Sequence, residues 1–183
     1  QIKENPASVA IGGGSAVGGW DHLKVLMAAR SAGVEDVRKV KYIAFAGGGE
    51  AVTQLLAGSL QAFTGDLSEA KGFVDSGDIK VLAVLAPERL EGAFADFPTA
   101  KEQGIDAIGA NWRGFYAPGG MSDAAYSYWV DNISTLYDSE EWKQVMEQNG
   151  LAPLDLQGDE FQQFVADSVQ EITDLSKEIG ILQ

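Results

Sequence analysis

The stretch IGGGSAVGGWDH, residues 11–22, brings together residue types that can hold or attack a ligand. Five glycines lie within positions 12–19, Ser15 stands among them, and the stretch ends at His22, the chain's one histidine. Such a pattern is used by a serine nucleophile on a strained turn, by nucleotide-binding loops, and by loops whose backbone N–H groups hold an anion. It also occurs in flexible connections that bind nothing.

The stretch completes none of three known enzyme motifs. A nucleophile elbow needs glycine two residues before and two residues after the serine; Gly13 satisfies the first requirement, but Val17 occupies the second site. A dinucleotide-binding fingerprint that starts from Gly12 and Gly14 places its third glycine at Val17 as well. A P-loop needs Gly-Lys-Ser/Thr, and the loop contains no lysine.

Anion binding by backbone donors remains compatible with the stretch. A glycine-rich loop that enters a helix can turn several N–H groups toward one point, where the helix dipole is positive, and Ser15 can add a hydroxyl. A flexible connection stays open as the alternative. His22 would lie in the first turn of the helix and position a ligand or the loop. Without a cysteine or a second histidine it cannot form a Cys–His pair or a conventional zinc site, so we predict no metal and no cofactor.

A second glycine run, Gly47–Gly49, follows the apolar stretch VKYIAF (40–45) and precedes another helical pattern. Asp66 follows a third short apolar stretch and can accept a ligand hydroxyl or cap a helix, which is the more usual role. Farther along, Arg113 lies in an extended segment, where it can pair with a ligand carboxylate or with a surface acid.

The elements that must position these residues alternate along the chain. Apolar stretches at 7–11, 40–45, 60–63 and 79–86 predict four strands, and helical patterns begin near Asp21, Glu50 and Asp66. This order is typical of an α/β fold, a parallel sheet with helices on both faces. Both glycine runs then lie at the carboxyl ends of strands, where open α/β sheets bind ligands.

The C-terminal part is different. An extended crossover leads to helical patterns with large apolar faces through residue 183. We expect an α/β ligand-binding domain at 1–110, followed by the crossover and C-terminal helices at 111–183.

Charge and composition exclude several classes. With 13 Lys and Arg against 27 Asp and Glu, the chain repels phosphate backbones, so we predict no nucleic-acid partner. No apolar run approaches the ~20 residues that span a bilayer, and the first residues do not resemble a signal peptide.

Several stretches together resemble the solute-binding receptors of tripartite tricarboxylate transporters, the Bug family. They are GGGSAVGGWDHL (12–23), VKYIAFAGGGEAVTQLLAGSLQA (40–62), SGDIKVLAVLAPERL (76–90), FPTAKEQGID (97–106), NWRGFYAPGG (111–120) and DEFQQFV (159–165). The resemblance covers nearly the whole chain, and FPT with EQG and NWRG with APGG agree in spacing.

The resemblance implies a type II-like periplasmic binding protein fold, a non-catalytic receptor on the periplasmic or extracellular face of the membrane, and membrane subunits of the transporter as partners. It implies a small organic carboxylate as ligand, citrate-like or a dicarboxylate, held by backbone N–H groups and waters. The predicted ligand-binding residues are Gly13, Gly14, Ser15, Ala16, Gly18, Gly19, His22, Phe45, Gly47, Gly48, Gly49, Asp66 and Arg113.

Two departures from the family pattern shape the expectation. The stretch that supplies much of the family's first domain is not in this sequence, so we expect half of a two-lobed clamp, weak ligand binding, and C-terminal helices covered by a second copy in a homodimer or swapped arrangement. Gly19 stands where many relatives have serine. The alternatives are a hydrolase using Ser15 and His22, a nucleotide-dependent transferase, and a partner-binding module without a small ligand.

Overall fold

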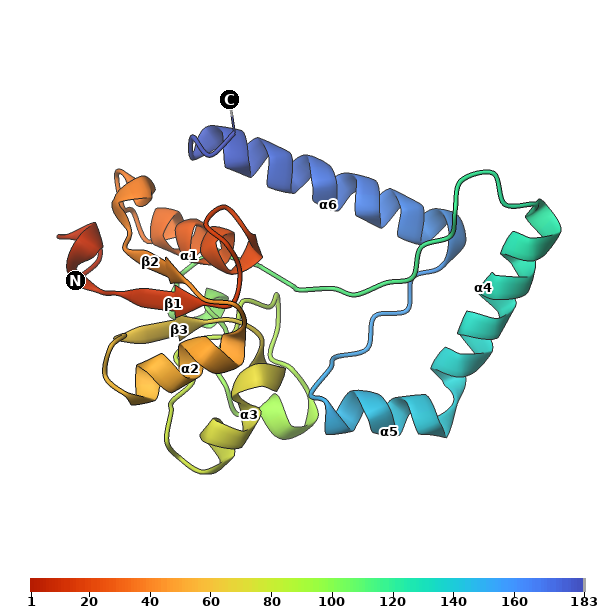
Figure 1. Ribbon diagram of the computed structural model, residues 1–183, viewed down its shortest axis with the longest axis horizontal. Coiled ribbons are helices and arrows are strands. Elements are labelled where there is room, and N and C mark those ends of the chain that lie inside the picture. Colours follow the sequence, from red (N-terminus) through yellow and green to blue (C-terminus); the bar gives the residue numbers. More distant parts are fainter. Residues whose placement is uncertain (183) are drawn as a thin grey trace. The chain divides into compact units, whose positions relative to one another are not determined.

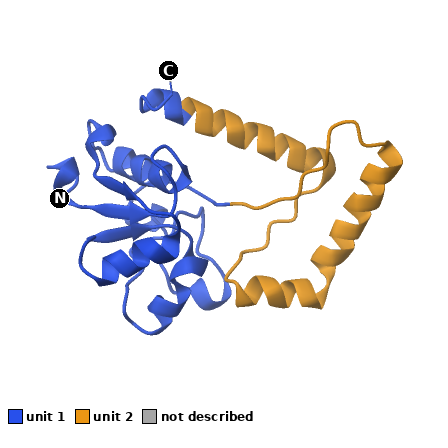
Figure 2. Ribbon diagram, viewed as in Figure 1, with its two compact units in different colours: residues 1–111, 175–183 blue, residues 112–174 orange. Residues whose placement is uncertain are grey.

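The structure is a computed structural model that describes residues 1–182 (Figure 1). It divides into two compact units, one made of residues 1–111 and 175–183 and the other of residues 112–174 (Figure 2).

The first unit is built on a parallel sheet of three strands. β1 (Ile11–Gly13) lies between β2 (Tyr42–Ala44) and β3 (Ala62–Thr64), and Ile11 is in register with Tyr42 on one side and Ala62 on the other. Since all three strands are parallel, their carboxyl ends meet at one edge. The predicted α/β class is confirmed.

Three helices follow the three strands. They are α1 (Trp20–Ser31), α2 (Gly48–Leu56) and α3 (Leu67–Asp75). The chain moves from β1 outward to β2 and then back past β1 to β3, so right-handed crossovers place α1 and α2 on opposite faces of the sheet. α1 ends as predicted before Gly33, whose φ of +86° favours glycine. Short 3-10 helices lie at Pro6–Ser8, Val37–Lys39, Gly92–Phe94 and Lys101–Gln103.

The core of this unit lies between the sheet and its helices. Leu26 and Val52 are fully buried, and Leu23 and Leu60 nearly so. Burying side chains of this size stabilises the fold by about 1.5–3 kcal/mol each. This packing fixes α1 and α2, and therefore their N-terminal ends, against the sheet.

Two predicted strands need correction. The first begins at Ile11, not at Ala7, and continues through Gly12 and Gly13, because both neighbouring strands pair with these glycines. The apolar run 79–86 does not form a strand. It makes only an isolated parallel bridge, Val84 to Thr99, and Leu82 is 68% exposed. An apolar run becomes a strand only where a backbone partner lies beside it, and here the pairing ends after Val84 and Leu85.

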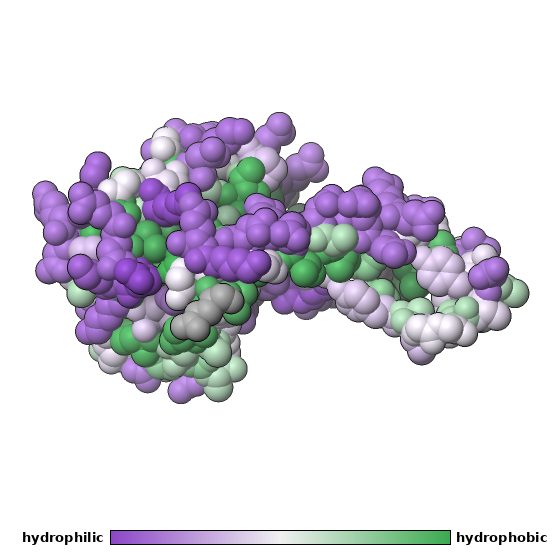
Figure 3. All heavy atoms as spheres, turned by 90° about the horizontal axis from the view of Figure 1, so that it is seen from above, coloured by the Kyte–Doolittle hydropathy of each residue, from purple (hydrophilic) through white to green (hydrophobic). Residues whose placement is uncertain are grey.

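The second unit is helical. α4 (Asp123–Asp138) and α5 (Glu140–Gln148) belong to it entirely, and α6 (Gly158–Glu178) mostly, since its last residues belong to the first unit. Trp112 packs edge-on against Phe161 and Phe164, with ring centroids 5.6 Å apart in each pair. Neither α4 nor α5 contains a buried residue, and Tyr128 and Trp129 are more than half exposed. Apolar side chains thus reach the surface (Figure 3).

Candidate functional site

The two glycine loops lie against each other at the carboxyl edge of the sheet. Gly14 follows β1, and a Cβ on it would come within 2.8 Å of the backbone of Gly47 and Gly48, which follow β2. Only glycine permits this approach. The prediction that both loops share one edge of the sheet is confirmed.

The first loop contains a tight turn at residues 16–19. The Gly19 N–H donates to the Ala16 carbonyl at 2.8 Å, and Gly18 has φ +86°, whereas no non-glycine residue in 1–182 has a positive φ. A negative φ at Val17 followed by a positive φ at Gly18 defines a type II turn. The turn brings the chain to Gly19, the N-cap of α1.

Three side chains of this stretch bind its own backbone. The Asp21 N–H donates to Ser15 Oγ at 3.0 Å, the Gly14 N–H to Asp21 Oδ2 at 3.1 Å, and the Gly18 N–H to His22 Nδ1 at 3.0 Å. These contacts fix a loop that its glycines would otherwise leave mobile.

His22 is buried, and its ring accepts a hydrogen bond from the backbone of the loop. Because Nδ1 accepts the Gly18 N–H, the ring is neutral with its proton on Nε2. Burial lowers the pKa of His22 from its ordinary 6.5, which favours the same neutral state. Its ring lies 4.6 Å from that of Tyr42, centroid to centroid.

Tyr42 connects β2 to the loop. Its hydroxyl donates to the Ser15 carbonyl at 2.7 Å and lies 3.4 Å from Ser15 Oγ. Burial, the largest effect, raises the pKa of Tyr42, so the phenol stays protonated. Within residues 1–182 no hydrogen bond joins Ser15 to His22, so the pairing that a Ser/His hydrolase needs is not formed.

Other backbone donors of the loop have no acceptor within the part of the chain that the structure describes. These are the N–H groups of Ser15, Ala16 and Val17, and those of Trp20 and His22 in the first turn of α1. Ala16 and Val17 are exposed. Unpaired donors at the positive end of a 12-residue helix favour an anionic group.

The second loop differs because carboxylates of the chain already occupy it. The Gly48 N–H donates to Glu69 Oε1 at 3.3 Å, and the Ala46 N–H donates to Glu50 Oε2 at 3.1 Å. A Cβ on Gly48 would collide with the Glu69 carboxylate. Glu69 also completes a capping box with Asp66 at the start of α3. Within residues 1–182, the first loop therefore leaves more of its backbone N–H groups unpaired than the second loop does.

A buried lysine joins three segments beside the first loop. Lys24 Nζ lies 2.8 Å from Asp21 Oδ1 and 3.7 Å from Asp66 Oδ1, and the lysine side chain is only 5% exposed. The other oxygen of Asp66 accepts the Asn111 side-chain N–H at 2.7 Å.

The structure places most of the predicted residues at this edge. Gly13 ends β1, Gly47 is the N-cap of α2, and Gly49 lies in its first turn. The Phe45 ring packs over Gly12, on the other face of β1 from Asp21. Arg113 belongs to the second unit, so its role stays a prediction.

Sequence reasoning missed Asp21, Lys24, Tyr42, Glu69 and Asn111. Three of these had a signal: Asp21 and Lys24 are spaced i, i+3 at a helix start, and Glu69 has the spacing of a capping box with Asp66. Tyr42 and Asn111 lie in stretches that carry the family resemblance, but their contacts could not be inferred, because their partners are 27 and 45 residues away.

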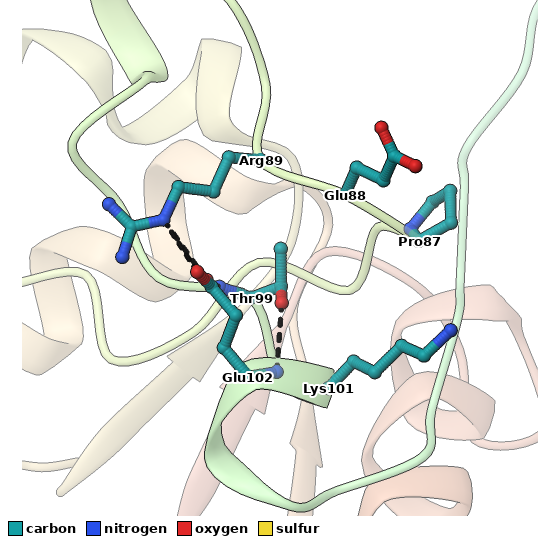
Figure 4. A pocket seen from close by; sticks show the side chains of 6 residues that line it. All are labelled: Pro87, Glu88, Arg89, Thr99, Lys101 and Glu102. Carbon is teal, nitrogen blue, oxygen red and sulfur yellow. Dashed lines mark hydrogen bonds and ion pairs between the residues drawn. The ribbon is translucent and has the colours of Figure 1, made fainter.

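A separate pocket of about 310 Å³ lies around Arg89, Thr99 and Glu102 (Figure 4). The Thr99 N–H and Arg89 Nε donate to the Glu102 carboxylate, at 2.7 and 2.8 Å, and the Thr99 contact first, then Arg89, lowers the pKa of Glu102. The FPT and EQG motifs thus meet in a local cap. The Arg89–Glu102 pair is about half exposed and supplies little binding energy.

Residues 1–182 contain neither a cluster of metal ligands nor a membrane-spanning helix. No three His, Asp or Glu side chains gather there as a metal ion would require. No helix there has the length and apolar content needed to cross a membrane.

Comparisons with known proteins agree with this fold. Over 98% of the chain it is 24% identical to a UPF0065 protein of Bordetella pertussis and 25% identical to the BugT protein of the same organism. The chain spans 54% of the length of each of these curated relatives.

Solved structures also match. A TctC solute-binding protein from Polaromonas, solved without ligand, is 24% identical with a TM-score of 0.74, over 93% of this chain and 57% of the other. An R. palustris protein solved with adipate is 19% identical with a TM-score of 0.81, over 98% and 58%.

A family model described as tripartite tricarboxylate transporter family receptor matches residues 1–181. With the parallel sheet and the paired glycine loops, this match shows that the chain belongs to the tripartite tricarboxylate transporter receptor family, whose members are solute-binding proteins.

Proposed function

We propose that this chain is part of an extracytoplasmic receptor that captures a small organic carboxylate, citrate-like or a dicarboxylate, for a tripartite tricarboxylate transporter. It acts by binding and does not catalyse a reaction. The one observation that carries the proposal is the set of unpaired N–H groups in the braced loop 15–17 and the first turn of α1.

The chemistry of these donors supports a carboxylate. Each N–H can donate to one carboxylate oxygen without a cationic side chain, and the helix dipole adds to the attraction. This allows a protein of net charge −14 to bind an anion locally. The adipate bound to the R. palustris structure is a dicarboxylate of the proposed class.

The predicted site residues fall into three groups under this proposal. Ser15, Ala16 and His22 contribute N–H groups, and the other loop-one residues Gly13, Gly14, Gly18 and Gly19 shape the turn. Gly47, Gly48 and Gly49 form a wall in which the Gly48 N–H already donates to Glu69. We propose Phe45, Asp66 and Arg113 as further lining residues.

The wider assignments are proposals as well. We infer that residues 1–110 form the ligand-binding lobe and that 111–183 contain helices of the other lobe. The receptor would work on the periplasmic or extracellular face of the membrane and deliver its ligand to the membrane subunits of the transporter.

A titration tests the ligand class. Citrate, succinate and adipate are added to the chain and followed by calorimetry and thermal shift, with 1,6-hexanediol as the uncharged control for adipate. We expect at least one carboxylate to raise the melting temperature and the diol to leave it unchanged. No response to any carboxylate, at concentrations high enough to detect the weak binding expected of one lobe, would exclude the proposal.

Val17 permits a sharper test of the backbone donors. Proline suits the second position of a type II turn, so Val17→Pro removes one exposed N–H while the turn is kept. Losing a hydrogen bond to a charged group costs about 1.5–3 kcal/mol, so we expect at least about tenfold weaker binding. The control Val17→Ala keeps the N–H and should bind like the wild type. Equal affinities for the two variants would contradict the proposal.

A further inference from the structure

Lys24 carries a charge in a place where a charge is costly. The residue lies on α1 and is 4% exposed, and its ammonium lies between the carboxylates of Asp21 and Asp66. A buried ammonium is tolerated only when it is paired, and each of these carboxylates is itself mostly buried. The two ion pairs restrict where the ammonium and the two carboxylates can lie, so the cluster is suited to positioning.

Each carboxylate uses its second oxygen to hold another segment. Asp21 Oδ2 accepts the N–H of Gly14, at the start of the first glycine loop. Asp66 Oδ2 accepts the side-chain N–H of Asn111, the last residue before the second unit begins. One ammonium therefore connects the backbone of the loop to the end of segment 105–111 through two carboxylates.

The lysine stem supports the same connection by packing. A Cβ on Gly109 would lie 2.9 Å from Lys24 Cγ, so the aliphatic chain lies directly against the backbone of this segment. The Gly109 N–H donates to the Leu85 carbonyl at 2.9 Å, which holds the segment in place. The contact leaves Lys24 little freedom to move away from the two carboxylates.

We infer that Lys24 is a positioning residue of the carboxylate site. It fixes Asp21, which holds the Gly14 end of the loop, and through Asp66 it couples the loop to Asn111. The effect on ligand binding rests on the proposed function, whereas the effect on the position of the loop does not. Lys24 acts through Asp21 and Asp66, not by contact with the ligand.

The test combines one variant with two matched controls. Lys24→Met keeps the stem against Gly109 and removes the ammonium. Lys41→Met removes the same charge from an exposed position. Phe94→Ala removes a buried ring from the 3-10 helix Gly92–Phe94, where it packs on Phe97 outside the glycine loops and the Lys24 cluster. The double variant Lys24→Met with Asp66→Asn restores the wild-type net charge, so it serves if the single variant does not fold.

Two readouts are measured on the folded chain. The first is amide hydrogen exchange at Gly14 and Asp21 without ligand, and the second is the affinity for citrate and adipate. For Lys24→Met or the double variant we expect about tenfold faster exchange at Gly14 and about tenfold weaker binding, since a loosened support displaces the donors. Lys41→Met and Phe94→Ala should leave local exchange at Gly14 and the affinity within about twofold of wild type.

The outcomes separate the two hypotheses. If the Lys24 variants match the controls in Gly14 exchange, the positioning role is wrong, whatever the ligand. If the wild type binds no carboxylate but Gly14 exchange accelerates as expected, the proposed function fails and the positioning of the loop by Lys24 stands. If exchange accelerates while affinity for a bound carboxylate is unchanged, Lys24 shapes the loop but not the site, and the inference is overturned.

Discussion

Individual side chains in the loop 14–22 serve mainly to hold its backbone. Ser15 and Asp21 each accept a backbone N–H of the other's segment, and His22 accepts the N–H of Gly18. The residues that resemble a catalytic serine and histidine thus act as acceptors, and under the proposed function the ligand binds the N–H groups between them. The sequence correctly places Ser15 in the glycine loop and His22 in the first turn of α1. Their hydrogen-bond partners, the N–H groups of Asp21 and Gly18, are known only from the fold.

The neutral state of His22 makes the stability of the loop dependent on pH. The pKa of His22 is lowered in the folded chain and near 6.5 in the unfolded chain, so the unfolded chain takes up the proton first on acidification. The contribution is present in full above about pH 6.5 and is lost as the pH falls through the folded pKa.

We therefore expect the free energy of unfolding to decrease more between about pH 7.5 and about pH 5.5 in the wild type than in His22→Asn, whose amide oxygen can accept the same N–H without titrating. Urea unfolding at each pH measures this difference. Parallel pH profiles for the two proteins would show that His22 does not contribute.

At the scale of elements, the site depends on two strand–helix junctions packed without side chains between them. Gly14 lies against Gly47 and Gly48, and Asp66 caps α3 as the sequence predicts. The glycine runs, the caps and the helical periodicity are local signals, so they were predictable. The prediction of a strand at 79–86 was wrong because an apolar pattern is a local signal. Whether a partner strand lies beside it depends on the fold, and within residues 1–182 only Val84 of this run pairs, with Thr99.

This packing predicts opposite effects for two glycines of the junction. Gly14→Ala places a Cβ against backbone that cannot move aside, and we expect a loss of about 1–3 kcal/mol of stability. Gly49→Ala meets open space in the first turn of α2, and we expect a gain of about 0.5–1 kcal/mol from helix propensity. Chemical denaturation of both variants measures the change. A similar effect in both would mean that the loops do not pack as described.

For the molecule as a whole, the exposed apolar side chains of the second unit stand out. Tyr128 and Trp129 on α4 and Val169 on α6 are each more than half exposed. The chain also spans about half the length of its curated relatives. A homodimer through these helices remains our proposal for how the faces are covered.

Because each copy carries a net charge of −14, self-association should strengthen with salt. We expect sedimentation velocity to show more dimer at about 300 mM than at about 20 mM salt. Trp129→Lys should reduce the dimer fraction in both, whereas a surface change in the first unit, Lys41→Met, should not. A chain that is monomeric in all conditions would contradict the proposal.

The sequence by itself determined the α/β class, the order of the first three strands and their helices, the placement of both glycine loops at one sheet edge, and the failure of the nucleophile-elbow and dinucleotide motifs at Val17. These properties follow from local pattern and chain order. The tertiary structure decided which donors are unpaired, that Glu69 occupies the second loop, and that Lys24 joins Asp21, Asp66 and Asn111 around the first. Those facts depend on contacts between residues up to 45 positions apart, which only the folded chain brings within hydrogen-bonding distance.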